Sequence, residues 1–460
     1  MADRSLGYEE ALETMRRGRG LLTVVLAAAL VAGGIALQRL GPREPEPAPP
    51  GTITTGAWFC PHGGGDGWSG ILEVANPGES EVQARVTSMG SNGSGKPQTL
   101  MLAPGTTSRV AVLATDGASA SMVEYFGGWM AAGWVLVAGG DESGVAAEPC
   151  VPEAGRRFLL PDGTADPDQE AWVVVMNPFG SEAVFSLTIL TYQHPPIRNT
   201  ALTDFVLKPQ HSVAFRLNPE WMGTVAGEVD ASLGRVAAAS LGIASGGGAR
   251  SVAGTPAGST RVVLPGGLDD NNASVVVMNP TEENASLSAA LLTDDAEQTA
   301  AGAQSQGVEA MSARTLDVVT SSPSTIELSS DGPVIAASRR TFVVGGDQGA
   351  TLGAPAASAD WVVLPAVGGP PYDPRLILAN PDEVDAEVEL SLLGEDGLGE
   401  SVTVTVPARR TVLAPTDFTA SAPLAAVRVH ATQGGVVPVF VSYSQDRAGY
   451  AVSLGVSVPH

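Results

Sequence analysis

The sequence predicts an all-β protein of four tandem, immunoglobulin-like antiparallel β-sandwich repeats of about 100 residues each. An Asn-Pro dipeptide recurs at intervals of 101, 102 and 101 residues, which indicates one structural unit copied four times. Short apolar segments are separated by turn residues roughly every 8–12 positions, as in β-sandwiches. No repeat contains a segment with the periodicity of a long helix. The dipeptides are Asn76-Pro77, Asn177-Pro178, Asn279-Pro280 and Asn380-Pro381.

Each repeat opens with an apolar strand that ends in proline, at residues 58–61, 158–161, 262–265 and 362–365. A loop rich in Gly, Asp and Pro leads to a second apolar strand, which ends at the Asn-Pro dipeptide. Segments of alternating polarity follow, such as 81–86 and 387–392. A period of two is typical of a strand with one buried face. Each repeat closes with a hairpin-like pair of strands, so the pattern favours about seven strands per repeat.

The Asn-Pro dipeptide has a structural interpretation. Proline fixes φ at the second position of a turn, and asparagine can bond the backbone beyond it. A second turn begins at Pro104, Pro209 and Pro407, whereas the third repeat has Met311 where a proline is expected. We therefore expect that turn to differ in the third repeat.

The repeats are predicted to occupy residues 57–152, 157–255, 260–355 and 360–460. The linkers between them are short, so we expect a rod or a bent stack of domains. A β-propeller with four blades is the competing fold. Its blades usually take about 40–50 residues, and a repeat of this length favours a whole domain instead.

The N-terminal region predicts a membrane anchor. Residues 21–37 carry no charge, and three arginines, Arg16, Arg17 and Arg19, precede them. The 17-residue length is at the short end of the spanning range of about 17–25, and the arginines place the N-terminus inside. We expect a cytoplasmic tail (1–20), a transmembrane helix (21–38), a proline-rich linker (39–56) and four extracytoplasmic domains, so a single-pass protein of the cell membrane. A cleaved signal peptide is the alternative.

The two cysteines support an oxidising location. Cys60 ends the first strand of the first repeat and Cys150 lies in its last strand, so only one disulfide is possible. The other repeats have leucine at the position of Cys60. A redox pair is disfavoured because the chain lacks a Cys-x-x-Cys motif.

Charge and motifs exclude several function classes. A net charge of −24 disfavours nucleic acid as a partner. The chain lacks the motifs of serine hydrolases, zinc proteases, β-lactamases and phosphate-binding loops. The five histidines lie singly, without metal-ligand spacing. We expect no enzyme and no resident cofactor, with a hydrolase that uses scattered carboxylates as an alternative.

Candidate binding residues lie in the loops that precede the Asn-Pro turns. Trp68, next to Asp66 in a glycine-rich loop, is predicted to be an exposed side chain that can stack on a sugar, whereas Trp58 and Trp134 are expected in the core. In the second repeat, Asp162, Asp166 and Asp168 form an acidic loop that could bind calcium. Solvated turns are the alternative interpretation of these carboxylates.

The Leu-Pro strand starts, the Asn-Pro turns, the segment 407–412 and the Trp-x-Cys-Pro start at Trp58 together resemble an actinobacterial, membrane-anchored family of exported proteins of unknown function. The resemblance covers residues 57–458 and implies β-domains at the cell envelope, without catalytic residues to transfer. We expect a non-enzymatic envelope scaffold or binding module. Its partners would be the membrane, a cell-wall glycan or an envelope protein, and a cell-wall carbohydrate-binding protein is the first alternative.

Overall fold

The computed structural model describes residues 54–139, 144–163, 165, 168–192, 194–198, 200–217, 223–244, 248–266, 268, 272–300, 303–320, 323–332, 334–342, 348–368, 371–444 and 449–459. Residues Ile53–His460 form one compact unit. Most of the described residues lie in strands and very few lie in helices, so the all-β prediction is confirmed. The predicted tail, anchor and most of the linker lie outside them. Among the described helices, none has the length and apolar character needed to cross a membrane.

Eight antiparallel sheets form four successive pairs, each of one five-stranded and one four-stranded sheet, and we name the pairs units 1 to 4. Unit 1 comprises β1 (Thr55–Cys60), β2 (Ser69–Asn76), β3 (Val82–Gly90), β4 (Gly93–Ser94), β5 (Gln98–Leu102), β6 (Thr106–Val112), β7 (Ala120–Phe126), β8 (Ala131–Ala138) and β9 (Gly144–Pro149). Unit 2 comprises β10 (Arg157–Leu160), β11 (Gln169–Asn177), β12 (Ala183–Thr191), β13 (Ile197–Arg198), the 3₁₀ helix η1 (Thr200–Leu202), β14 (Phe205–Leu207), β15 (His211–Arg216), β16 (Val225–Leu233), β17 (Ala237–Ala244) and β18 (Ala249–Ala253).

Unit 3 comprises β19 (Arg261–Gly266), β20 (Asn272–Asn279), β21 (Ala285–Thr293), β22 (Glu297–Thr299), β23 (Gln306–Val308), β24 (Ser312–Val319), β25 (Ser324–Ser330), β26 (Ala336–Phe342) and β27 (Gln348–Leu352). Unit 4 comprises β28 (Asp360–Val363), β29 (Tyr372–Asn380), β30 (Ala386–Leu393), β31 (Leu398–Val406), β32 (Arg410–Leu413), α2 (Thr416–Ser421), β33 (Ala426–Gln433), β34 (Val437–Ser444), β35 (Ala451–Leu454) and β36 (Val456–Ser457).

Strand order recurs from unit to unit. The five-stranded sheet of unit 1 has the order β1-β7-β3-β4 with β5 also paired to β3, and its four-stranded sheet has the order β6-β2-β8-β9. Units 2 and 3 repeat both orders. In unit 4 the nine-residue β31 replaces the two short edge strands, and β36 pairs with β28. The recurrence follows the recurring turns, because each fixes where a strand must end.

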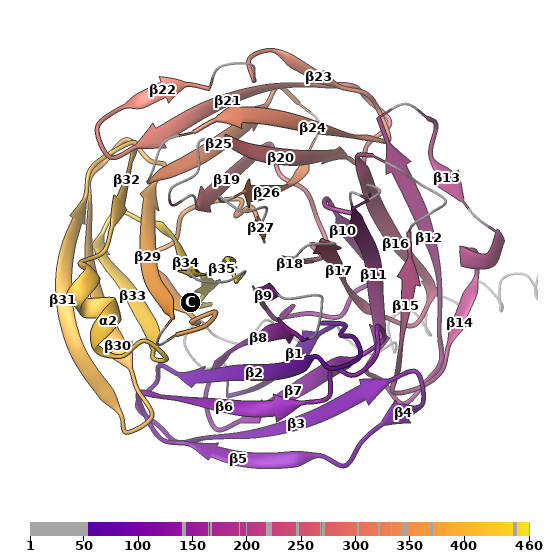
Figure 1. Cartoon of the computed structure of the whole chain (residues 1–460), viewed down its shortest axis with the longest axis horizontal. Coiled ribbons are helices and arrows are strands. Elements are labelled where there is room, and N and C mark those ends of the chain that lie inside the picture. Colours follow the sequence, from indigo (N-terminus) through magenta and orange to yellow (C-terminus); the bar gives the residue numbers. More distant parts are fainter. Residues whose placement is uncertain are drawn as a thin grey trace, which may run out of the picture. The chain divides into compact units, whose positions relative to one another are not determined.

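Figure 1 shows the four units around a central axis, with the four-stranded sheets inside and the five-stranded sheets outside. The edge strands of the inner sheets, β9, β18, β27 and β35, lie beside one another at the centre. Unit 4 also contacts unit 1, since the amide of Thr107 donates to the carbonyl of Gly394 over 2.9 Å. The expected rod or bent stack is therefore wrong, because the units close into a ring.

The inner strands are rich in small residues because both of their faces are covered. Every residue of β18 is buried, as is all but the last residue of β17, with its run Ala237–Ala239. Outer strands such as β3 and β21 alternate between buried and exposed residues, as expected for a sheet with one face in solvent. Small side chains let four inner sheets approach a common axis at normal packing density.

At three of the four junctions, the hydroxyl at one recurring position forms a hydrogen bond to the backbone of the neighbouring unit. In the strand register, this position lies opposite the residue that immediately precedes the Asn-Pro dipeptide. It is occupied by Thr107, Ser212 and Thr411. The hydroxyl of Ser212 donates to Ala118 of unit 1, and that of Thr411 donates to Leu292 of unit 3 over 2.9 Å. The hydroxyl of Thr107 accepts from Ala426 of unit 4 over 3.4 Å. The junction that closes the ring thus uses the same position as two of the other three junctions.

The Asn-Pro turns are built alike in all four units. The buried amide of Asn177 donates to the carbonyls of Ser181, Leu207 and Lys208 over 2.8, 3.1 and 3.1 Å, and its oxygen accepts from the amide of Phe179. The side chains of Asn76 and Asn279 make the four corresponding bonds, and that of Asn380 makes three of them, to two carbonyls and one amide. Each turn therefore ties the end of one strand to a strand about 30 residues away.

The second recurring turn depends on a left-handed residue and not on proline. Gly105, Gln210, Met311 and Arg409 occupy this position with φ of 69°, 54°, 49° and 57°. The amides of Gln210, Met311 and Arg409 each donate to the residue that follows an Asn-Pro dipeptide. The expectation that the turn at Met311 would differ is wrong, because the backbone geometry is kept without the preceding proline.

Candidate functional site

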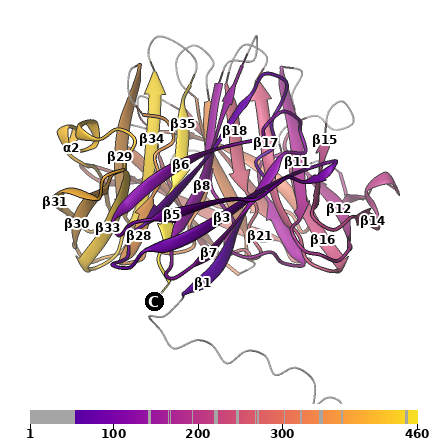
Figure 2. The same cartoon turned by 90° about the horizontal axis from the view of Figure 1, so that it is seen from below.

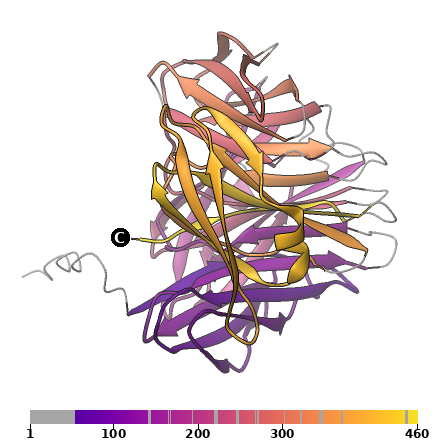
Figure 3. The ribbon, with the colours of Figure 1, turned by 90° about the vertical axis from the view of Figure 1, so that its left-hand side faces the viewer.

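A cavity of about 520 Å³ lies where the four central strands end, and we call it the axial pocket. All four units line it: residues 148–153 of unit 1, 253–256 of unit 2, 352–355 of unit 3 and 454–457 of unit 4. Ala57 of β1 and Pro459 also line it. The start of β1 and the C-terminal end lie on the same face of this compact unit (Figures 2 and 3). The pocket is thus at the end of the axis where the chain enters and leaves the ring.

Glu148 is the buried acid of this pocket. It lies in β9, where it is 1% exposed. Its Oε1 accepts from the amides of Ala253 in β18 and Leu352 in β27, over 3.1 and 3.4 Å. Both strands are edges of their sheets, and edge strands present amides that their own sheets leave unpaired. Glu148 therefore joins unit 1 to units 2 and 3 across the axis.

The second carboxyl oxygen of Glu148 is different. Its Oε2 is buried and has no hydrogen-bond partner among the described residues. Burial raises the pKa of Glu148 to about 8, and the two amide donors oppose that rise. The carboxyl group consequently changes its charge near neutral pH, and one of its oxygens is left for another partner.

Aromatic side chains form one side of the pocket. Trp58, Tyr125 and Trp361 are 3%, 5% and 5% exposed, and Trp129 packs edge-on against Trp58 with ring centroids 6.1 Å apart. The indole N–H of Trp58 donates to Met130 over 2.8 Å, and that of Trp361 donates to Ser358 over 3.0 Å. The N–H groups of these two indoles are bonded outside the pocket, so the rings contribute apolar atoms to its lining.

The pocket carries acidic groups without basic ones. Glu153, which is exposed, lines it together with Glu148, and its described lining contains no Lys, Arg or His side chain. Several prolines also line the pocket, namely Pro149, Pro152, Pro256 and Pro355. An aromatic, apolar wall with acidic groups suits a ligand that has an apolar body and a positive charge.

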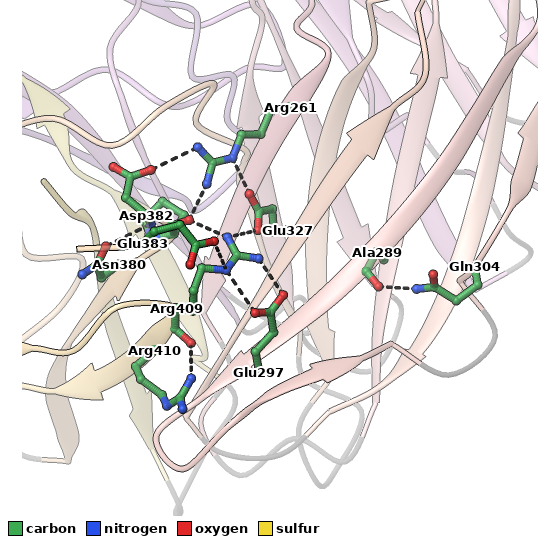
Figure 4. A network of polar contacts seen from close by, with 11 residues as sticks. Arg261, Ala289, Glu297, Gln304, Glu327, Asn380, Asp382, Glu383, Arg409 and Arg410 are labelled. Atoms are coloured by element: carbon green, nitrogen blue, oxygen red, sulfur yellow. Dashed lines mark hydrogen bonds and ion pairs between the residues drawn. The ribbon is translucent and has the colours of Figure 1, made fainter. Parts of the chain in front are cut away.

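A second polar cluster lies at the junction of units 3 and 4 (Figure 4). Arg409 contacts Glu297 over 2.8 Å and Glu327 over 2.5 Å. Arg261 also contacts Glu327, and it contacts Asp382 over 3.1 Å. Hydrogen bonding to Arg409 lowers the pKa of Glu297. Arginine side chains hold both glutamates, so these ion pairs join unit 3 to unit 4.

The structure places the predicted sugar-contact residues differently from expectation. Trp68 is 5% exposed and belongs to the core, so the expected exposed indole is wrong. Its loop folds back on the core, where the amides of Gly63 and Gly65 donate to Ser119 and Ala114. A Cβ at Gly65 would lie 2.9 Å from the Trp68 indole nitrogen, so glycine is needed for this close approach. Asp66 is exposed beside it, and the expected core positions of Trp58 and Trp134 are confirmed.

The predicted acidic loop does not form a site among the described residues. Asp162 is buried in an ion pair with Arg250 at 3.2 Å, and Arg250 also donates to Gln169. Asp168 is exposed, and Asp166 lies outside the described residues. Within the described part of the chain, no three His, Cys, Asp or Glu residues are grouped to hold a metal ion.

The predicted disulfide is confirmed, between Cys60 and Cys150, with Cα atoms 4.6 Å apart. Cys150 lines the axial pocket. Glu148, two residues earlier, was not singled out from the sequence. Its signal was present, since an acid interrupts an apolar strand at a position where units 2, 3 and 4 have Val252, Thr351 and Ser453 by strand register.

Comparisons with known proteins identify a family of unknown function. A solved structure, the tetra-tandem repeat in the extending region of a large adhesion protein, is 11% identical and covers 84% of this chain and 92% of that chain. Its TM-score is 0.10, which is too low to indicate a shared fold. The comparison with curated proteins found no match. A family model described as a family of unknown function, DUF5719, matches residues 120–368, more than half of the sequence. The chain therefore belongs to the DUF5719 family.

Proposed function

We propose that this chain is a non-enzymatic binding protein of the cell envelope, held at the membrane by residues 21–38, with the axial pocket as its binding site. The four sandwich units are copies of one immunoglobulin-like repeat that act as a rigid scaffold around this pocket. The observation that carries the proposal is the buried Glu148, which lines a cavity formed by all four units and whose buried Oε2 lacks a described partner. Buried polar atoms in packed cores nearly always have a hydrogen-bond partner. An unpartnered carboxyl oxygen on a residue that lines a cavity is therefore more typical of a binding site.

The proposed location rests on three features. The uncharged segment 21–37 follows arginines, the proline-rich linker separates it from β1, and Cys60 is joined to Cys150. Disulfides are typical of oxidising compartments. The resemblance to actinobacterial anchored proteins agrees with this location.

Thiol trapping in intact cells tests the location. The full chain, expressed in a bacterial host, is treated with a maleimide under denaturing conditions before any oxidation can occur. We expect Cys60 and Cys150 to remain unmodified in the full chain and to react when residues 1–40 are deleted. Two modified thiols in the membrane-bound full chain would contradict an extracytoplasmic position.

A cell-wall glycan is the second candidate ligand, because the pocket contains tryptophan rings on which sugars can stack. Trp129 and Trp361 would then be the contact residues, in place of the buried Trp68. Retention of the full chain on isolated wall polysaccharide, lost on Trp129→Ala and kept on Trp172→Ala, would support this candidate. Absence of retention would remove it.

A further inference from the structure

We propose that the axial pocket binds a small organic ammonium ion, with an ammonium N–H donated to Glu148 Oε2 and an apolar body against Trp58, Trp129 and Trp361. The inference rests on the proposed function, because it names the ligand class of the same pocket. Three independent features of the pocket carry it: an unused acceptor, the sign of its charges and its aromatic wall.

The acceptor is Glu148 Oε2. Its partner oxygen already accepts two backbone amides, which fix the carboxyl group in place at the centre of the ring. An ionised carboxylate is an acceptor only, so the oxygen without a described partner calls for a donor. An ammonium group supplies a donor together with the compensating charge, and charge-assisted hydrogen bonds are the stronger kind.

The charged groups of the lining favour a ligand with a positive charge. Glu148 and Glu153 are acids, Tyr125 is the other titratable group, and basic side chains are missing from the described lining. An anionic ligand would find no cationic side chain in the described lining to compensate its charge. The chain as a whole has a net charge of −24, which attracts cations to its surface.

The aromatic wall suits a cation with an apolar body. Trp58 and Trp361 have their N–H groups bonded to Met130 and Ser358, which leaves the rings themselves as the contact surface. Ring faces attract cations, most strongly in tryptophan. At about 520 Å³ the pocket is large enough for an amine of drug-like size.

Binding of such a ligand depends on pH through Glu148. The titratable groups that line the pocket with it are Glu153 and Tyr125. Among its neighbours, β8, β27 and β35 contain no acidic or basic side chain, and on β18 Arg250 is paired with Asp162. The free pocket holds a proton on Glu148 below about pH 8, and an ammonium ion displaces it. Affinity therefore increases as pH rises toward 8.

The test uses 2-phenylethylamine and its neutral analogue 2-phenylethanol, titrated calorimetrically into the full chain in detergent between pH 6 and 9. We expect the amine to bind, with an affinity that rises several-fold per pH unit below pH 8 and then levels. Glu148→Gln keeps an oxygen for the two amides and removes the charge, so it should weaken amine binding by about 10-fold or more. Glu153→Gln, on the exposed rim, should change it by less than about 3-fold.

Three results would overturn the inference: no amine binding, equal amine binding by Glu148→Gln, or an affinity that falls as pH rises. Binding of 2-phenylethanol without the amine would show that the pocket binds ligands and that the ligand class is wrong. Failure of both probes would also count against the pocket as the binding site, and so against the proposed function. Circular dichroism of each variant confirms that the fold is kept.

Discussion

Glu148 shows how a single residue gives one repeat a role that the other three lack. The equivalent positions hold Val252, Thr351 and Ser453, which need no charge compensation. A buried acid is costly to keep unless it has partners, and Glu148 has two amides from other units. Glu148 therefore links units 1, 2 and 3 across the axis, and in our proposal it also supplies the acceptor of the axial pocket.

Glu148 makes stability depend on pH. Its pKa is about 8 in the folded chain and about 4.3 when unfolded. Between these values the folded state keeps a proton that the unfolded state has lost, so the free energy of unfolding falls as pH rises and levels above about 8. In Glu148→Gln, we expect the free energy of unfolding, measured in urea, to lack this decrease, which is about 1.4 kcal/mol per pH unit. Parallel curves for the two proteins from pH 5 to 9 would contradict the burial of this acid.

Trp68 belongs to the core, although its glycine-rich sequence suggested a flexible loop. Gly65 is needed for close approach to the indole, and the amides of Gly63 and Gly65 are bonded to the carbonyls of Ser119 and Ala114. We expect Trp68→Ala to lower the free energy of unfolding by about 3–5 kcal/mol, as for other buried aromatic residues. Trp172→Ala, at a half-buried position, is the control and should cost less. Denaturant unfolding measures both, and a neutral Trp68→Ala would place the side chain outside the core.

At the scale of elements, the Asn-Pro turns explain why the repeat could be identified from sequence. Each asparagine side chain satisfies two or three strand-end carbonyls, and the bonds need an amide at that place. Proline provides the turn and a carbonyl at the junction of units, as when Arg157 donates to Pro280. Because the asparagine is needed to bond the strand ends and the proline to form the turn, the dipeptide recurs at constant spacing.

Replacement of one such asparagine should be costly. Asn177→Asp removes the donors to Ser181, Leu207 and Lys208 and buries a charge, so we expect a loss of about 3–5 kcal/mol. The exposed Asn92→Asp, with the same chemical change, should be close to neutral. Thermal and urea unfolding compare the two. Similar stability of both variants would mean that the side chain does not tie the strands together.

At the scale of the whole molecule, the sequence predicted the all-β class and the disulfide but not the ring. Local patterns such as Asn-Pro spacing and alternating polarity reveal strands and turns. Closure depends on contacts between residues more than 300 positions apart, such as Thr107 and Ala426, which no local pattern encodes. The pocket was missed for the same reason, since its lining comes from four separated segments. The small residues of β17 and β18 were the available signal.

Ring closure is the claim on which the pocket, the ligand and the role of Glu148 all depend. Without unit 4 beside unit 1, Trp361 and residues 454–457 would not complete the cavity. The contact between the backbones of Thr107 and Gly394 is the most direct point at which to test it. A backbone hydrogen bond of 2.9 Å keeps the two Cα atoms less than about 7 Å apart, the limit for joining two cysteines by a disulfide.

The measurement is the mass of the Thr107→Cys/Gly394→Cys double variant after mild oxidation and alkylation under denaturing, non-reducing conditions. The closed ring predicts a second disulfide beside Cys60–Cys150, and therefore no alkylated cysteine. The control pair Thr107→Cys/Gly307→Cys, placed in units 1 and 3, should retain two alkylated thiols. Two alkylated thiols in the Thr107/Gly394 variant would show that units 1 and 4 do not meet, and would contradict the ring.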